Sequence, residues 1–293
     1  MARLSKRLNK YPFASEHNLR IDKLNFTKTY EFIQTLDIDK TKKLKGISSD
    51  RADALLAGLS IINVFMNLKD NANIAVSDKT SLNGIALSLE QQTSYEKPLT
   101  DILGECLYKI NTRYNNYNKN SDNIVNLSLN IFKLLKILHR MPKTYIKIMR
   151  IAAALLDSGK RINYNNYLKY SFDIIRDSEI NGATHREQIL AAFVVANVNP
   201  ENFSMTEWVK YSSMFLEEDL DNVRKLAVMV KLASLLDRFE RNKVLDLTCD
   251  ILGDSVIFKT ICEQSDNCDL EIREALKSRP DFRRVFNKHL DVF

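Results

Sequence analysis

Eight basic residues lie close together in the middle of the chain, and their charges suit contact with phosphate groups. They are Lys133, Lys136, Lys143, Lys147, Arg150, Lys160, Arg161 and Lys169. Intervals of seven, four and three residues from position 136 to position 150 let several side chains share a helical face, provided that Pro142 does not reorient them. Such charges can follow a phosphate polymer without reading any base. A solvated lysine-rich surface is the alternative interpretation.

His185 and Arg186 form a second candidate, an anion contact at the start of a helix. The alternative is that, with Glu187, they only order the helix start. The net charge of +6 suits polyanionic partners and selects none of them. Few aromatic residues lie among the basic ones, so we expect no sequence-specific nucleic-acid binding.

The cysteine pattern and the apolar runs indicate a cytoplasmic protein without membrane contact. Cys106, Cys249, Cys262 and Cys268 form no Cys-x-x-Cys pair, and no nearby histidine completes a zinc site, so we expect reduced packing residues. The basic N-terminus is followed by no apolar run, so it does not resemble a signal peptide. The longest continuous apolar stretch, residues 189–196, is too short to span a bilayer.

The elements that must position these residues are expected to be mainly helices, because the chain has only 7 glycines and 5 prolines. From about Tyr95 onward the apolar residues recur at helical spacing, with breaks at Pro142 and Pro200. The Asn-rich residues 111–126 are predicted to form a mobile loop. Residues 244–252 and 256–262 are typical of β-strands, and residues 290–293 are predicted to add an edge strand.

The N-terminal residues give a different pattern. Ser48, Ser49 and Asp50 can cap a helix whose apolar stripe begins at Leu55, and Gly46 can end the helix before it. A short strand at residues 74–77 and a polar turn with Gly84 follow. This order resembles the last part of the second actin-like domain in the Ppx/GppA family of exopolyphosphatases and guanosine pentaphosphate phosphatases.

The middle and end of the chain resemble later parts of the same family. The segments that carry the resemblance are residues 138–142, 151–159, 162–164, 169–171, 174–176, 185–188, 223–226 and 231–237. The resemblance covers the chain from about Tyr11 to Phe293. It implies an α+β, predominantly α fold with three parts. These are a truncated actin-like (ribonuclease H-like) remnant at residues 1–92, a degenerate HD-like helical domain at 93–203 and a small C-terminal α+β domain at 204–293.

The resemblance also locates a metal site that the residues do not fit. Metal-dependent HD domains hold a divalent ion with a His-Asp pair, a further histidine and a distant aspartate. Here Leu156 precedes Asp157, tyrosines occupy positions 167 and 170, and Ser234 corresponds to the distant acidic position. We therefore expect no metal site and no catalytic residue. Asp157 is predicted to be a hydrogen-bonding residue at a helix end.

The family resemblance places the phosphate-cradling glycine loops and the water-activating acid earlier in the actin-like pair. No Asp-x-Gly-Ser or Gly-Gly-Gly-Ser loop occurs in these 293 residues. Phosphoryl transfer depends on such positioning groups. We therefore expect the chain alone to be inactive, with Mg²⁺ bound only in a completed enzyme.

Three hypotheses follow. The first is an accessory, homodimeric family member that binds polyphosphate, a related phosphorylated ligand or a protein partner. The second is the C-terminal subunit of a split exopolyphosphatase, in which a separate N-terminal half docks on residues 11–90 and the chain alone exposes apolar surface. The third is a decayed protein without function. The predicted phosphate contacts are Lys136, Lys143, Lys147, Arg150, Lys160, Arg161, Lys169, His185 and Arg186.

Overall fold

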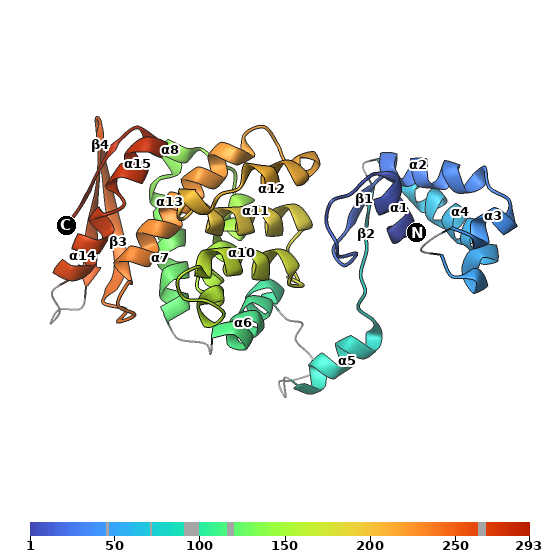
Figure 1. The fold of residues 1–293 in the computed structure, drawn as a ribbon, viewed down its shortest axis with the longest axis horizontal. Coiled ribbons are helices and arrows are strands. Elements are labelled where there is room, and N and C mark those ends of the chain that lie inside the picture. The colour runs from blue at the N-terminus through green and yellow to red at the C-terminus, as the bar shows by residue number, and fades with distance from the viewer. Residues whose placement is uncertain (45–46, 71, 91–99, 116–119, 263–267) are drawn as a thin grey trace. The chain divides into compact units, whose positions relative to one another are not determined.

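The computed structural model describes residues 1–44, 47–70, 72–90, 100–115, 120–262 and 268–293 (Figure 1). The chain forms two compact units, Met1–Thr100 and Asp101–Phe293. Helices dominate both, and the few strands form two small sheets, so the predicted α+β, predominantly α class is confirmed. The further division at residue 203 and the actin-like origin of the first unit stay predictions.

The first unit combines short helices with a two-stranded sheet. Its elements are α1 (Ala2–Leu8), β1 (Arg20–Asp22), α2 (Lys23–Gln34), α3 (Ile38–Lys42), η1 (Ser49–Arg51), α4 (Ala52–Leu68), β2 (Asn73–Ala75) and α5 (Ser81–Glu90). The strands β1 and β2 are antiparallel, with Ile21 opposite Ile74. The Asp22 carboxylate caps α2 by accepting from the Asn25 amide at 2.7 Å.

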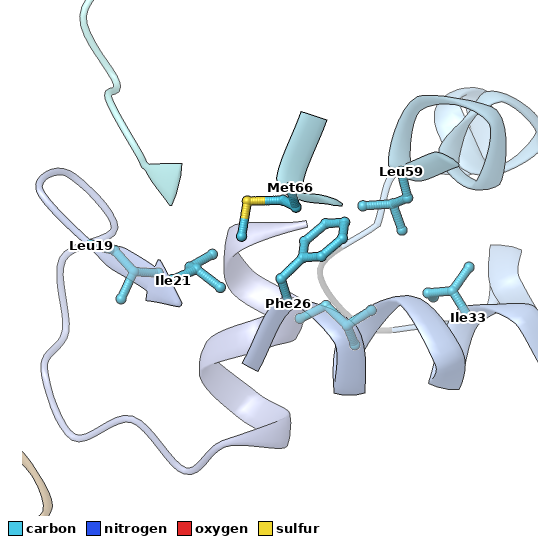
Figure 2. Packing of buried hydrophobic residues seen from close by; sticks show 7 residues of the cluster. Leu19, Ile21, Phe26, Ile33, Leu59 and Met66 are labelled. Atoms are coloured by element: carbon cyan, nitrogen blue, oxygen red, sulfur yellow. The ribbon is translucent and has the colours of Figure 1, made fainter. Parts of the chain in front are cut away.

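A small core holds this unit together, as Figure 2 shows. Phe26 of α2 is fully buried and packs between Leu59 and Met66 of α4 and Ile21 of β1. Only one face of α4 enters this core, because five of its large apolar residues are exposed. These are Leu56, Ile61, Val64, Phe65 and Leu68, with Leu82, Ile85 and Leu89 of α5 also exposed.

The apolar character of α4 changes one expectation. By length and composition alone, Ser49–Leu68 is a segment able to cross a membrane. Polar residues at positions 60, 63 and 67 interrupt the run, so a search for continuous apolar residues passes over it. The expected absence of a membrane partner therefore stays a prediction, and α4 is the segment on which it depends.

The second unit is a layered helical assembly that ends in a three-stranded sheet (Figure 1). Its helices are α6 (Ile102–Asn115), α7 (Asn120–Leu134), α8 (Lys136–His139), α9 (Tyr145–Ala154), η2 (Ser158–Arg161), α10 (Tyr167–Asp177), α11 (His185–Ala196), η3 (Pro200–Asn202), α12 (Met205–Lys210), η4 (Ser212–Met214), α13 (Asp219–Leu236), α14 (Asp269–Leu276) and α15 (Arg279–Phe286). Its strands are β3 (Val244–Leu252), β4 (Ser255–Cys262) and β5 (His289–Val292).

The helix α11 lies at the centre of the helical assembly. All residues from Ile189 to Ala196 are buried, which explains the continuous apolar run in the sequence. The helix packs against α9, α10 and α13, and α7 packs against α9 and α13. The break predicted at Pro142 is confirmed, because α8 ends at His139 and α9 begins at Tyr145.

The C-terminal sheet has the order β3-β4-β5. The strands β3 and β4 form an antiparallel hairpin, and Gly253 supplies the positive φ of +52° that its two-residue turn requires. The strand β5 runs parallel to β4 at the edge of the sheet, so the predicted edge strand is confirmed. The helices α14 and α15 pack against β5 and α13, and bury Ala275 and Phe282.

Several local predictions are wrong. No side chain caps α4, because the turn η1 lies between Ser48 and the helix, and Ser49 donates its hydroxyl to Asp50 at 3.0 Å. The Asn-rich segment is largely helical, since α6 extends to Asn115 and α7 begins at Asn120. The predicted cap at residue 46 lies outside the described residues.

The cysteine prediction holds for two residues and is wrong for two. Cys262 and Cys268 are joined by a disulfide. Cys106 and Cys249 are in no disulfide, and burial raises the pKa of the Cys249 thiol to about 11. A thiol with a raised pKa is a poor nucleophile, which suits a packing residue.

Candidate functional site

Arg186, a predicted anion contact, forms an ion pair with a buried carboxylate of the protein itself. Its Nη2 atom lies 2.6 Å and 2.8 Å from the two carboxylate oxygens of the fully buried Asp219. The Tyr145 hydroxyl donates to the same carboxylate at 2.5 Å, and Asn222 donates to the Tyr145 hydroxyl at 3.0 Å. The cluster ties α9, α11 and α13 together, so Arg186 has a structural role here.

His185 is also unsuited to the predicted role, because its side chain is buried. It follows Thr184, whose hydroxyl accepts from the Glu187 amide, while the Glu187 carboxylate accepts from the Thr184 amide at 2.8 Å. This reciprocal pair is a capping box that fixes the start of α11. The alternative interpretation, a residue that orders a helix start, describes the geometry better than an exposed anion contact.

Two basic residues of α9, Arg150 and Lys147, also contact other groups of the protein. Arg150 forms a bidentate pair with the Asp101 carboxylate, with 3.0 Å between Nη1 and Oδ1. This guanidinium holds the pKa of Asp101 below its usual range. The Lys147 ammonium is exposed and donates to the Gly182 carbonyl oxygen at 3.0 Å. Arg150 is thus neutralised locally, whereas Lys147 keeps an unbalanced charge.

Asp157 and Lys160 form a neutralised pair at the place where the resemblance locates the HD-like metal site. The Lys160 ammonium lies 2.6 Å from Asp157 and 3.8 Å from Glu240. It also lies 5.6 Å from the centre of the Tyr167 ring. Burial raises the pKa of Asp157, although Lys160 opposes that shift. Burial also raises the pKa of Tyr167 to about 12, so its hydroxyl stays neutral near pH 7.

The remaining HD-like positions are built for packing. Leu156 is buried, and its carbonyl oxygen accepts from the Ser171 hydroxyl at 2.7 Å. Ser234 donates to the Lys231 carbonyl oxygen at 2.8 Å, within its own helix. A Cβ atom at Gly159 would lie 2.2 Å from the Tyr167 carbonyl oxygen, so only glycine fits this close approach. Among the described residues, no group of three or more metal-ligating side chains comes together.

Four residues of the predicted set are exposed and have neither an ion-pair partner nor a side-chain hydrogen bond among the described residues. They are Lys136, Lys143, Arg161 and Lys169. They do not lie along one helix, because Lys136 begins the short α8 and Arg140 then takes a left-handed conformation with φ +55°. Lys143 lies in the turn before α9, Arg161 ends η2, and Lys169 lies in α10. We call these four residues the free basic set.

A basic cavity beside α15 was not foreseen. Three arginines and a histidine line a cavity of about 760 Å³ near the C-terminus. The signal in the sequence is Arg279-Pro-Asp-Phe-Arg283-Arg284, in which a proline starts a helix and arginines recur after four and five residues. This helix was not predicted, so its arginines were not considered together.

A comparison with protein families identifies the helical unit. The family model "Ppx/GppA phosphatase, domain III" matches residues 105–276, which is more than half of the chain. No curated protein matches the sequence. The match contains the buried helix α11, the Asp157–Lys160 pair and the free basic set, and it ends before the arginines of α15. The chain therefore belongs to the Ppx/GppA phosphatase family.

Proposed function

We propose that this family member is an accessory protein that binds polyphosphate or a related phosphorylated ligand. The observation that carries the proposal is the contrast within the predicted set. Lys136, Lys143, Arg161 and Lys169 are exposed without ion-pair partners among the described residues, while Arg150, Lys160 and Arg186 each contact a carboxylate. Exposed ammonium and guanidinium groups can contact successive phosphates of a polymer while the ligand keeps much of its hydration.

The residues at the HD-like positions support a role in binding over hydrolysis. A catalytic metal needs several nitrogen or oxygen ligands in open geometry. Leu156 offers none, the Ser234 hydroxyl is used within its helix, and the Asp157 carboxylate is paired with Lys160. We propose that this place in the helical unit has become a structural ion pair.

Binding and hydrolysis of a long-chain polyphosphate, with Mg²⁺ and at two salt concentrations, test this function. We expect binding that weakens as salt rises, because screening reduces attraction between exposed charges, and we expect no release of phosphate. Phosphate release that is lost on charge reversal at Lys143 and Lys147 would show that the purified chain is an enzyme and would overturn the accessory proposal.

The exposed apolar side chains of the first unit favour a second candidate, a split exopolyphosphatase. Phe65 is 67 % exposed and Leu68 is 75 % exposed, although neighbouring residues of α4 are in the core. Large apolar faces of this kind mark interaction sites. A separately encoded N-terminal half of the same family, with the glycine loops and the water-activating acid, would cover this face and would supply the Mg²⁺ site.

Mixing the chain with an isolated N-terminal actin-like half from a complete family member tests the split enzyme. Phosphate release only in the mixture would support it, and Phe65→Glu should abolish both the complex and the activity. Retained activity in Phe65→Glu, or none in the mixture, would contradict it. We further propose that the protein is cytoplasmic and forms a homodimer. Light scattering of the purified chain would detect the dimer as twice the monomer mass.

A further inference from the structure

The C-terminal subdomain, by which we mean β3, β4, α14, α15 and β5, contains a basic cavity. The cavity beside α15 and β5 has a volume of about 760 Å³, within the range of small-molecule sites. Arg279, Arg283 and Arg284 come from α15, and His289 begins β5. Asp291 is the one carboxylate in the lining, so the formal charge of these side chains is +2 with a neutral histidine (three arginines minus one aspartate).

The core of the subdomain fixes the helix that carries these arginines. Phe282 of α15 is fully buried and packs against Phe286, with 4.7 Å between the centres of the two tilted rings. The opposite face, with Arg283 and Arg284, is therefore turned outward. Arg279 is oriented further, because it donates through Nε to the Leu290 carbonyl oxygen at 2.9 Å and pairs with Asp291 at 2.5 Å. These contacts reduce the entropy lost on binding.

All three guanidinium groups keep donors for a ligand, since the contacts of Arg279 use Nε and Nη2 and leave Nη1. Arg283 is exposed and forms no side-chain hydrogen bond or ion pair with any described residue. Arg284 has only a 3.5 Å contact with Asp281, and its side chain is 66 % exposed. Arginine stays charged at any physiological pH, and its planar fork matches the oxygens of a phosphate group.

A second cavity nearby has a less basic lining than the cavity beside α15. It has a volume of about 400 Å³, and Arg284 also lines it. There Asp281 pairs with Lys231 at 2.6 Å, and Asp221 pairs with Lys225 at 2.6 Å. Its lining has three cations, Arg224, Lys231 and Arg284, against these two carboxylates, so its formal charge is +1 (three minus two), compared with +2 for the cavity beside α15. The cavity with Arg283 is the more basic of the two.

We propose that the cavity beside α15 binds a compact anion with two or more linked phosphate groups. Arg279 and Arg283 are four residues apart, so their side chains are neighbours on one helix face and can hold adjacent phosphates of one ligand. The site is separate from the free basic set and lies beyond the residues matched by the family model. It does not rest on the proposed function, because a short phosphate ligand can occupy it without any polymer on the helical unit.

Calorimetric titration of the full chain with orthophosphate, pyrophosphate and tripolyphosphate tests the proposal. We expect tripolyphosphate to bind more tightly than orthophosphate, and Arg283→Gln to weaken it about tenfold, because a charge-assisted bidentate contact is lost. Arg273→Gln is the matched control, since Arg273 is an exposed arginine of the neighbouring helix α14 and does not line the cavity.

A second readout does not depend on a substitution. Tripolyphosphate should protect Arg283 of the wild-type chain from an arginine-selective dicarbonyl reagent, while Arg273 stays reactive, as peptide mass spectrometry would measure. Equal affinity of Arg283→Gln and Arg273→Gln, with no protection of Arg283, would overturn the proposal. So would a wild-type chain that binds none of the three anions.

The outcomes separate this site from the proposed function. If Lys143→Gln/Lys169→Gln weakens long-chain polyphosphate but leaves tripolyphosphate unchanged, both sites stand. If the lysine variant weakens tripolyphosphate and Arg283→Gln does not, the cavity proposal fails and the free basic set stands as the binding site. If only Arg283→Gln weakens either ligand, the cavity stands and the proposal for the free basic set fails.

Discussion

The two basic regions of the second unit use their charges differently. In the helical part, Arg150, Lys160 and Arg186 contact Asp101, Asp157 and Asp219, so these cations serve the fold. In the cavity beside α15, three arginines share one lining carboxylate. A run of lysines and arginines in a sequence therefore overstates the charge that a ligand meets. The available charge depends on which carboxylates the fold brings alongside.

The largest effect on stability should come from breaking the ion pair between Asp219 and Arg186. Asp219→Asn removes the charge that holds Arg186 and Tyr145, and leaves a partly buried guanidinium without its partner. We expect a loss of about 3 kcal/mol in the free energy of unfolding. Urea denaturation would measure it. The control is Asp221→Asn, which removes an exposed pair with Lys225 and should cost about 0.5 kcal/mol or less. Equal losses for the two variants would contradict the structural role of Arg186.

A smaller effect, on ligand affinity, should come from removing the carboxylate that pairs with Arg279. Asp291→Asn releases the Arg279 guanidinium into the C-terminal cavity. We expect tripolyphosphate to bind about threefold to fivefold more tightly, because the ligand no longer competes with a carboxylate, which corresponds to about 1 kcal/mol. Calorimetry would measure the change. Asp254→Asn is the control, because Asp254 is exposed and does not line the cavity. Weaker binding by Asp291→Asn would mean that Asp291 orients Arg279 more than it neutralises it.

The smallest effect concerns pH. Because burial raises the pKa of Asp157 in the folded protein, the folded state binds this proton more tightly than the unfolded state. The contribution of Asp157 to stability therefore falls as pH rises from its unfolded pKa of about 4 through its raised folded pKa. Asp157→Asn should remove this component. The difference in unfolding free energy between wild type and variant, measured from pH 4 to pH 7, should change with pH in that direction.

A difference that does not change with pH, or that changes in the opposite direction, would contradict the raised pKa of Asp157. Asp101 supplies the opposite control. Arg150 lowers the pKa of Asp101, so its stabilising contribution is present above the unfolded pKa and is lost as pH falls.

Much of the fold was predictable because it depends on local patterns. The apolar run at residues 189–196 became the buried helix α11, and Pro142 separates α8 from α9 as expected. The Asn-rich segment was misjudged because composition outweighed the apolar spacing of Ile124, Leu127 and Ile131, which are buried in α7.

The site was less predictable, since it depends on contacts between residues far apart in the chain. Asp219 is 33 residues from Arg186, and Asp101 is 49 residues from Arg150. No local pattern pairs them. The prediction that Asp157 is a hydrogen-bonding residue needed only the neighbouring residue types, whereas its partner Lys160 was itself predicted to bind phosphate. The spacing of Arg279, Arg283 and Arg284 was visible in the sequence but needed a helix to give it meaning.

The most direct test of the account compares two double variants that lose the same charge. Lys143→Gln/Lys169→Gln removes two members of the free basic set, and Arg150→Gln/Lys160→Gln removes two cations that already contact carboxylates. Polyphosphate affinity would be measured for both, with circular dichroism to confirm folding. We predict that the first variant binds about tenfold more weakly than wild type and that the second stays within about twofold. An equal loss in the two variants would mean that net charge alone governs binding, and would contradict the account.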